Sequence, residues 1–129
     1  MVQHGLQQLQ KRAARIILRR DSSNDTFKVL EWADLEINRK IHKCVLVSKC
    51  LYDLVPQYLS NYFIGNSSLH IHYTRRKSDF HLPKPELSLT KRTFRYSGSV
   101  LFNSLPAHIK HATFICTFKS LLTNHFKNR

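Results

Sequence analysis

The sequence predicts a small, mostly α-helical domain of about five helices with an irregular middle that holds at most one short strand. Apolar residues recur at helical spacing in both end regions, and the 129 residues include only 3 Gly and 4 Pro. The periodicity is interrupted between residues 65 and 92, where Gly65, Pro83 and Pro85 lie. We therefore expect a single domain over residues 1–129 that is helical over 3–63, extended or looped over 65–92, and helical again over 93–127.

Three helical patterns precede the first proline. Residues 6–20 form an amphipathic basic helix with the apolar stripe Leu6, Leu9, Ala13, Ile16 and Ile17. A short helix through residues 27–32 follows, for which Asp25 or Thr26 is the expected N-cap. The clearest stripe runs from Ile37 to Val55 over about five turns, with Asp34 as its N-cap. Pro56 ends this helix and opens a further short one over residues 57–63.

The second half of the chain begins with a weak alternation over residues 69–92, which favours an extended or looped crossing. Helix returns over residues 93–103, followed by a turn at Leu105 and Pro106. A final apolar stripe from Phe114 to Phe126 predicts the last helix, with Thr113 as its N-cap. The side chains expected in the core are Trp32, Ile41, Val45, Leu51, Tyr52, Leu101, Phe102 and Phe118.

The charge is strongly positive and unevenly placed. The chain has 21 Lys and Arg against 8 Asp and Glu, a formal net charge of +13 at pH 7. Residues 1–20 hold five basic residues and residues 87–129 hold seven, and neither region contains an acid. A polyanion partner fits this distribution, because each Lys or Arg that meets a phosphate releases a condensed counterion. The alternative is that the charge only keeps the domain dispersed in solution.

Basic residues next to aromatic ones indicate where RNA or DNA would bind. Tyr73 precedes three cations, and cations alternate with Phe94 and Tyr96. Such rings either stack on unpaired bases or pack in the core of a small domain. The residues that we expect to contact phosphates are Lys11, Arg12, Arg15, Arg19, Arg75, Arg76, Lys91, Arg92 and Arg95.

The acidic residues, histidines and cysteines of the sequence argue against catalysis. A two-metal polymerase or nuclease site needs clustered carboxylates, whereas the eight acids here are scattered and no two are adjacent in sequence. His70 with His72, or His108 with His111, could each form half of a zinc site, but no Cys pair at ligand spacing completes either. We therefore expect no catalytic residue, no metal site and no cofactor, and hence no enzyme.

The cellular compartment is inferred from three features that the sequence lacks: a CxxC motif, a membrane-spanning run and a signal peptide. The three Cys are an odd number without a CxxC motif, which favours a reducing environment over a disulfide framework. No apolar run approaches the length of a membrane span, and the first residues lack the apolar core of a signal peptide. We expect an intracellular protein, nuclear or cytoplasmic, without a membrane partner, and the sequence leaves its oligomeric state open.

Six blocks of the sequence resemble, in the same order, the region that follows the polymerase domain in reverse transcriptases of non-LTR (LINE-type, jockey-like) retrotransposons. The most specific block, residues 93–106, is similar to that family's "SF-x-Y-x-G-x-x-LWNSLP", although Phe102 stands where the family usually has Trp. The blocks are residues 9–17 (LQKRAARII), 30–35 (LEWADL), 51–59 (LYDLVPQYL), Arg75 and Arg76 followed by 82–85 (LPKP), 93–106 (TFRYSGSVLFNSLP) and 118–122 (FKSLL).

This resemblance implies the C-terminal part of an RNA-directed DNA polymerase rather than a polymerase. The palm with its paired catalytic aspartates is absent, and 5′-truncated copies that encode only this tail are expected for such elements. The expected role is a basic helical domain that contacts nucleic acid without catalysis. The alternatives are a protein-interaction domain that docks an acidic partner, and a truncated element remnant with no maintained function.

Overall fold

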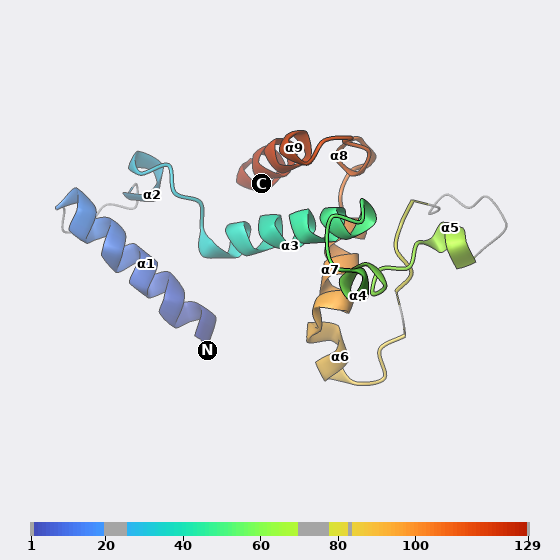
Figure 1. The fold of residues 1–129 in the computed structure, drawn as a ribbon. Helices are drawn as coiled ribbons and strands as arrows, with labels where there is room; N and C mark the ends of the chain where they lie inside the picture. The colour runs from blue at the N-terminus through green and yellow to red at the C-terminus, as the bar shows by residue number, and fades with distance from the viewer. Residues whose placement is uncertain (1, 20–25, 70–77, 83, 129) are drawn as a thin grey trace. The chain divides into compact units, whose positions relative to one another are not determined.

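The computed structural model describes residues 2–19, 26–69, 78–82 and 84–128, and this part of the chain contains nine helices and no strand. The expected mostly α-helical class is confirmed. Five of the nine helices have only four or five residues, and three of these, at Asn66–Leu69, Ser88–Arg92 and Ala107–Lys110, are the ones that the sequence did not predict. The helices are α1 (Val2–Leu18), α2 (Thr26–Val29), α3 (Leu35–Leu51), α4 (Gln57–Ser60), α5 (Asn66–Leu69), α6 (Ser88–Arg92), α7 (Phe94–Asn103), α8 (Ala107–Lys110) and α9 (Ile115–Lys127) (Figure 1).

The chain forms two compact units, Met1–Arg39 and Lys40–Arg129, here called the N-terminal and C-terminal units. The boundary falls inside α3, so each unit is described by itself. The single domain expected over residues 1–129 stays a prediction. No helix in the described residues is both long enough and apolar enough to cross a membrane.

In the N-terminal unit, α1 contacts the segment before α3 through a polar edge formed by Gln7 and Gln10. The Gln7 side-chain amide donates to both carboxylate oxygens of Asp34, at 3.0 and 3.1 Å. The Gln10 amide donates to the backbone carbonyl of Ala33 at 3.2 Å, and Ala14 is fully buried. Gln7, Gln10 and Ala14 follow one another at three- and four-residue spacing, so they share one face of the helix.

The apolar stripe predicted for α1 is therefore not the face that packs. Its four large side chains, Leu6, Leu9, Ile16 and Ile17, are 43–68% exposed. An amphipathic helix of a globular protein usually turns such a stripe to the core. Here the hydrogen bonds of the two glutamines orient the helix instead.

The core of the C-terminal unit is built on a chain of aromatic rings. Phe63 lies 5.4 Å from Phe94 and 5.3 Å from Phe80, measured between ring centroids. Phe80 then lies 5.1 Å from Phe102, which lies 6.2 Å from Phe118 of α9. Tilted and edge-on pairs at these separations add a favourable quadrupole interaction to the area that they bury. Further buried apolar side chains around the rings are Ile41, Cys44, Val47, Cys50, Leu105, Ile109 and Leu122.

The backbone of α7 comes close to α3 at Gly98. A Cβ atom placed on Gly98 would lie 3.0 Å from Cγ2 of Val47, which is fully buried. Only glycine leaves the space that the Val47 side chain occupies. This close approach fixes which face of α3 is buried.

The core predictions are confirmed at Ile41, Phe102 and Phe118, and Val45 and Leu101 are half-buried. They are wrong at Trp32, Leu51 and Tyr52, which are 37%, 47% and 46% exposed. Along α3 the buried side is centred on Ile41, Cys44, Val47, Ser48 and Cys50, because α7 meets the helix at Val47.

The exposed residues lie where the chain turns. Asp53, two residues after the end of α3, adopts a left-handed conformation (φ 52°), which leaves Leu51 and Tyr52 at the helix end. The Tyr52 hydroxyl donates to the carbonyl of Ala112 at 3.2 Å. Trp32 follows a second left-handed residue, Glu31 (φ 53°), in the segment before α3.

Some helix ends agree with the sequence and others do not: α3 ends at Leu51 rather than at Val55 before Pro56, and α2 ends at Val29 rather than at residue 32. Pro56 is the N-cap residue of α4, and the Thr93 hydroxyl caps α7 by accepting from the amide of Tyr96 at 3.4 Å. The last helix begins one residue later than expected, with Phe114 instead of Thr113 as its N-cap residue, and α4 ends at residue 60 rather than 63.

The middle of the chain is less extended than predicted. Helices α5 and α6 occupy part of residues 66–92, and the described residues there form no strand. One isolated antiparallel bridge joins Gly65 to Phe80. The amide of Asn66 donates to the carbonyl of Asp79 at 2.9 Å, and the amide of His81 donates to that of Ile64 at 2.8 Å. Two hydrogen bonds align these segments, but they are too few to extend into a ladder.

Candidate nucleic-acid interface

The cations predicted on the first helix are all exposed. Lys11, Arg12 and Arg15 lie on α1, and Arg19 follows its last residue in a left-handed conformation (φ 48°). At 100° per residue, the three helical cations fall within an arc of about 100°. No acid occurs in residues 2–19, so no carboxylate of α1 competes with a phosphate for these side chains.

A second group of exposed cations surrounds the corner between α6 and α7. Lys91 and Arg92 lie in the last turn of α6, and Arg95 lies in the first turn of α7. Thr93 holds the corner: its hydroxyl donates to the carbonyl of Thr90 at 2.7 Å, and its amide donates to the same oxygen at 3.1 Å. The three cations are thus presented within five residues on a hydrogen-bonded turn.

Two further features make the α6–α7 corner electropositive. The first turn of α7 carries the positive end of the helix dipole. In addition, Lys43 of α3 donates from Nζ to the hydroxyl of Ser97 at 3.1 Å, which adds a cation beside the N-terminal half of α7. Lys43 is not among the cations predicted from the sequence, because only the packing of α3 against α7 places it there.

The aromatic rings of this region that the structure describes are at least partly buried. Phe94 is half-buried and meets Phe63 edge-on, with an interplanar angle of 81°, so its ring belongs to the core. Tyr96 is half-buried as well, and Tyr73 lies outside the described residues. Of the two interpretations that the sequence left open for Phe94, core packing is the one observed.

A basic hollow between α3 and α9 was not predicted. It has a volume of about 220 Å³ and is lined by His42, Val45, Leu46 and Lys49 of α3 and by Lys119 of α9. The two lysines are 70 residues apart in sequence, so only the packing of these helices brings them to one hollow. No local pattern in the sequence could have identified them as a pair.

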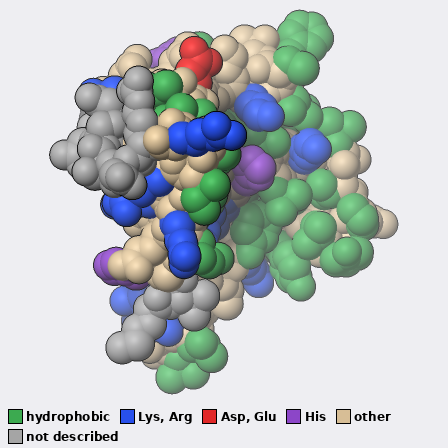
Figure 2. Space-filling view, turned by 90° about the vertical axis from the view of Figure 1, so that its left-hand side faces the viewer, with side chains coloured by type: hydrophobic (Ala, Val, Ile, Leu, Met, Phe, Trp, Pro, Cys, Tyr) green, Lys and Arg blue, Asp and Glu red, His purple; other side chains and the backbone are tan. Residues whose placement is uncertain are grey.

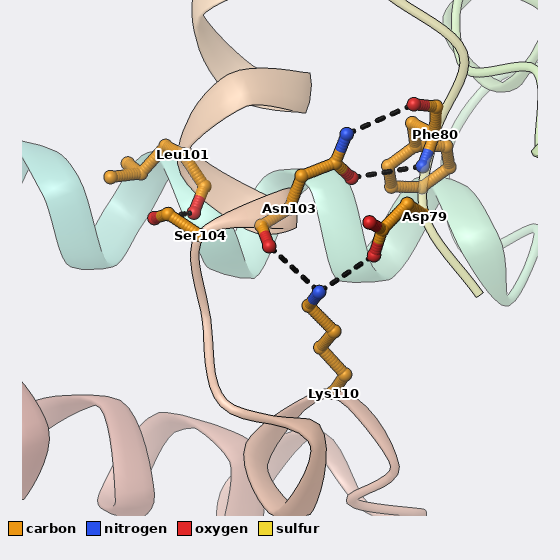
Figure 3. A network of polar contacts seen from close by, with 6 residues as sticks. All are labelled: Asp79, Phe80, Leu101, Asn103, Ser104 and Lys110. Atoms are coloured by element: carbon orange, nitrogen blue, oxygen red, sulfur yellow. Dashed lines mark hydrogen bonds and ion pairs between the residues drawn. The ribbon is translucent and has the colours of Figure 1, made fainter. Parts of the chain in front are cut away.

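A larger hollow of about 380 Å³ lies beside Asp79, Phe80 and Asn103, and its polar groups already have partners (Figure 3). The Asn103 side chain pairs with the backbone of Phe80 through two hydrogen bonds of 2.9 Å. Lys110 donates to the Asp79 carboxylate at 2.7 Å and to the carbonyl of Asn103 at 2.8 Å. These contacts fasten α7 and α8 to the 78–82 segment, and they make Lys110 structural.

The predicted cations form two groups, one in each unit. Lys11, Arg12, Arg15 and Arg19 belong to the N-terminal unit, and Lys91, Arg92 and Arg95 belong to the C-terminal unit. Arg75 and Arg76 lie outside the described residues. A single phosphate-contacting surface made of both groups stays a prediction. Figure 2 shows one face on which Lys and Arg side chains stand beside exposed apolar side chains and acidic side chains are scarce among those described.

The metal-binding residue types are dispersed. No three His, Cys, Asp or Glu side chains of the described residues converge on a point that could hold an ion, and His70 and His72 are not among these residues. Burial raises the pKa of the Cys44 thiol to about 12, an effect that the neighbouring charge of Lys43 only partly opposes. Burial also raises the pKa of Cys50. Both thiols are therefore protonated and unreactive at neutral pH.

Comparisons with protein-family models, with curated proteins and with solved structures find no match to this chain.

Proposed function

We propose that this chain is a non-catalytic C-terminal part of a non-LTR retrotransposon RNA-directed DNA polymerase, and that its basic helices contact RNA or DNA inside the cell. The observation that carries the binding proposal is the exposed arc of cations on α1, a helix without any acid. The origin rests on the six sequence blocks, of which residues 93–106 are the most specific.

The expected binding mode is contact with phosphates rather than with bases. The exposed groups on both basic elements are ammonium and guanidinium groups, and the ring of Phe94 packs in the core. Phosphate contacts position a protein on its nucleic acid but carry no sequence information. We therefore expect binding that tolerates any sequence and weakens steeply as salt increases.

The test is a salt titration of binding to a fluorescent single-stranded RNA, measured by anisotropy. If five cations meet phosphates, the logarithm of the association constant falls against that of the salt concentration with a slope of about −3.5, at about −0.7 per contact. Replacing Lys11 and Arg15 together by Gln reduces the steepness by about 1.4. Gln preserves helix propensity, and circular dichroism confirms that helix content is retained.

The control removes the same charge from elsewhere. Lys84 and Lys127 are exposed but belong to neither predicted group. The variant K84Q/K127Q keeps the slope of the unmodified chain. An affinity that is flat in salt, or an equal loss in both double variants, would contradict the proposal and leave only a general effect of net charge. In the same preparation, primer extension with Mg²⁺ or Mn²⁺ is expected to be absent, and template-dependent incorporation would overturn the non-catalytic assignment.

A further inference from the structure

The surface of α1 divides into three faces. Gln7, Gln10 and Ala14 face the rest of the N-terminal unit, and the cations occupy a second arc. The third face holds the exposed side chains of Leu6, Leu9, Ala13, Ile16 and Ile17. The proposed contact with phosphates uses only the second face, so the third has no role in it.

The exposed apolar face has the geometry of a helix-packing seam. Leu6, Leu9, Ala13 and Ile16 are spaced by three, four and three residues, which is the a/d pattern of a heptad repeat. Leu6, Leu9 and Ile16 are 43%, 60% and 68% exposed. The a and d side chains of such a stripe interdigitate with those of one facing helix, and Ile17 widens the apolar face on its e side. The face contains no aromatic ring on which a base could stack.

The charges beside the seam indicate what kind of helix fits. Arg12 occupies the g position next to the seam, Gln10 and Ile17 occupy the e positions, and Arg19 follows at the helix end. A second copy of α1 would place Arg12 against itself in an antiparallel pair, or against Ile17 in a parallel pair. Neither pairing supplies an acid. A partner with Asp or Glu at its flanking positions would neutralise the arginines.

We propose that the apolar seam of α1 docks one amphipathic helix of another protein, which carries Leu, Ile or Val at its a and d positions and Asp or Glu at the positions that flank them. The seam spans two heptads, so the interface is small and transient. Its apolar anchors supply the affinity, and Arg12 and Arg19 select the acidic partner. The proposal goes beyond nucleic-acid contact, because its apolar anchors take no part in that contact, although it shares Arg12 and Arg19 with the proposed phosphate-contacting group.

The test measures binding of the full chain to a fluorescent 21-residue peptide with Leu at a and d and Glu at e and g. A second peptide has Lys at e and g. We expect the Glu peptide to bind at least tenfold more tightly than the Lys peptide. The variant L9Q/I16Q should weaken binding of the Glu peptide at least tenfold while its affinity for RNA stays unchanged. As a matched control, L54Q/L89Q replaces two equally exposed leucines away from α1 and should leave both affinities unchanged.

A charge-reversal variant distinguishes loss of the docking interface from unfolding of the chain. The variant R12E/R19E should bind the Lys peptide more tightly than the Glu peptide, a gain that an unfolded chain would not show. Equal affinity for both peptides, or unchanged binding by L9Q/I16Q, would overturn the proposal. So would a dimer in sedimentation that L9Q/I16Q dissociates, or binding of phosphatidylserine vesicles without binding of the Glu peptide. Because L9Q/I16Q leaves the cations in place, failure here is distinguishable from failure of nucleic-acid binding.

Discussion

Replacing Gly98 by Ala tests the close approach of α7 to α3. The added methyl group would lie 3.0 Å from Cγ2 of Val47, and 3.5 and 3.6 Å from ring carbons of Phe94 and Phe63. Carbon atoms prefer separations of about 3.5–4.0 Å, so only the contact with Val47 is too short. Overpacking of a buried site costs about 1–3 kcal/mol, whereas Ala in a helix interior is favoured over Gly by about 1 kcal/mol. We therefore expect G98A to lower the free energy of unfolding by about 0–2 kcal/mol.

The assay is urea unfolding followed by circular dichroism, with two comparisons. G5A in α1 shows the helix-propensity gain alone, because nothing lies within 4 Å of a Cβ on Gly5. It should stabilise the helix by about 0.5–1 kcal/mol. In a Val47→Ala background the short contact is gone, so G98A should become stabilising by a similar amount. If G98A stabilises the unmodified chain as much as G5A does, the packing of α3 on α7 at this point is not as described.

Three further predictions concern the C-terminal unit. Phe102→Ala should lower the free energy of unfolding by about 3–5 kcal/mol, because the ring is 2% exposed. Leu51→Ala at a 47% exposed site should lower it by less than about 1 kcal/mol, and equal losses in urea unfolding would contradict the assigned core. Lys110→Met removes the partner of the Asp79 carboxylate, whose side chain is only 16% exposed. It should lower the free energy of unfolding by about 1.5–3 kcal/mol, and an unchanged value would contradict the network of Figure 3. The pKa of Cys44 rises from 9.0 to about 12 on folding, so between these pH values only the unfolded state loses the proton. This thiol should therefore make the free energy of unfolding fall by about 1.4 kcal/mol per pH unit. Cys44→Ala should show a shallower decline over the same pH range.

The positions of the longer helices could be predicted because they depend on spacing and caps within a few residues. The apolar periodicity located α1, α3, α7 and α9, and Thr93 caps α7 as its position before an apolar run suggests. Of the short helices, α2 and α4 were predicted, although both end earlier than expected, whereas α5, α6 and α8 were not, since four or five residues contain too few positions to show a period.

The candidate interface was predictable only in part. Exposure of Lys11, Arg15 and Arg95 follows from the cost of burying an unpaired charge, which the sequence alone implies. The hollow that Lys49 shares with Lys119 is different, because its two lysines come from helices far apart in the chain.

The sequence by itself therefore determined the helical class, the basic character of both ends and the approximate positions of the long helices, since local backbone preferences and charge need no tertiary contact. The tertiary structure decided which side of each helix is buried. On α1 the glutamine edge packs and the Leu and Ile stripe stays exposed, because Asp34 and the Ala33 carbonyl offer hydrogen bonds to Gln7 and Gln10. On α3 the buried side turns toward Val47, because the missing side chain of Gly98 lets the two backbones approach. Burial is a property of two surfaces, and the periodicity of one helix describes only one of them.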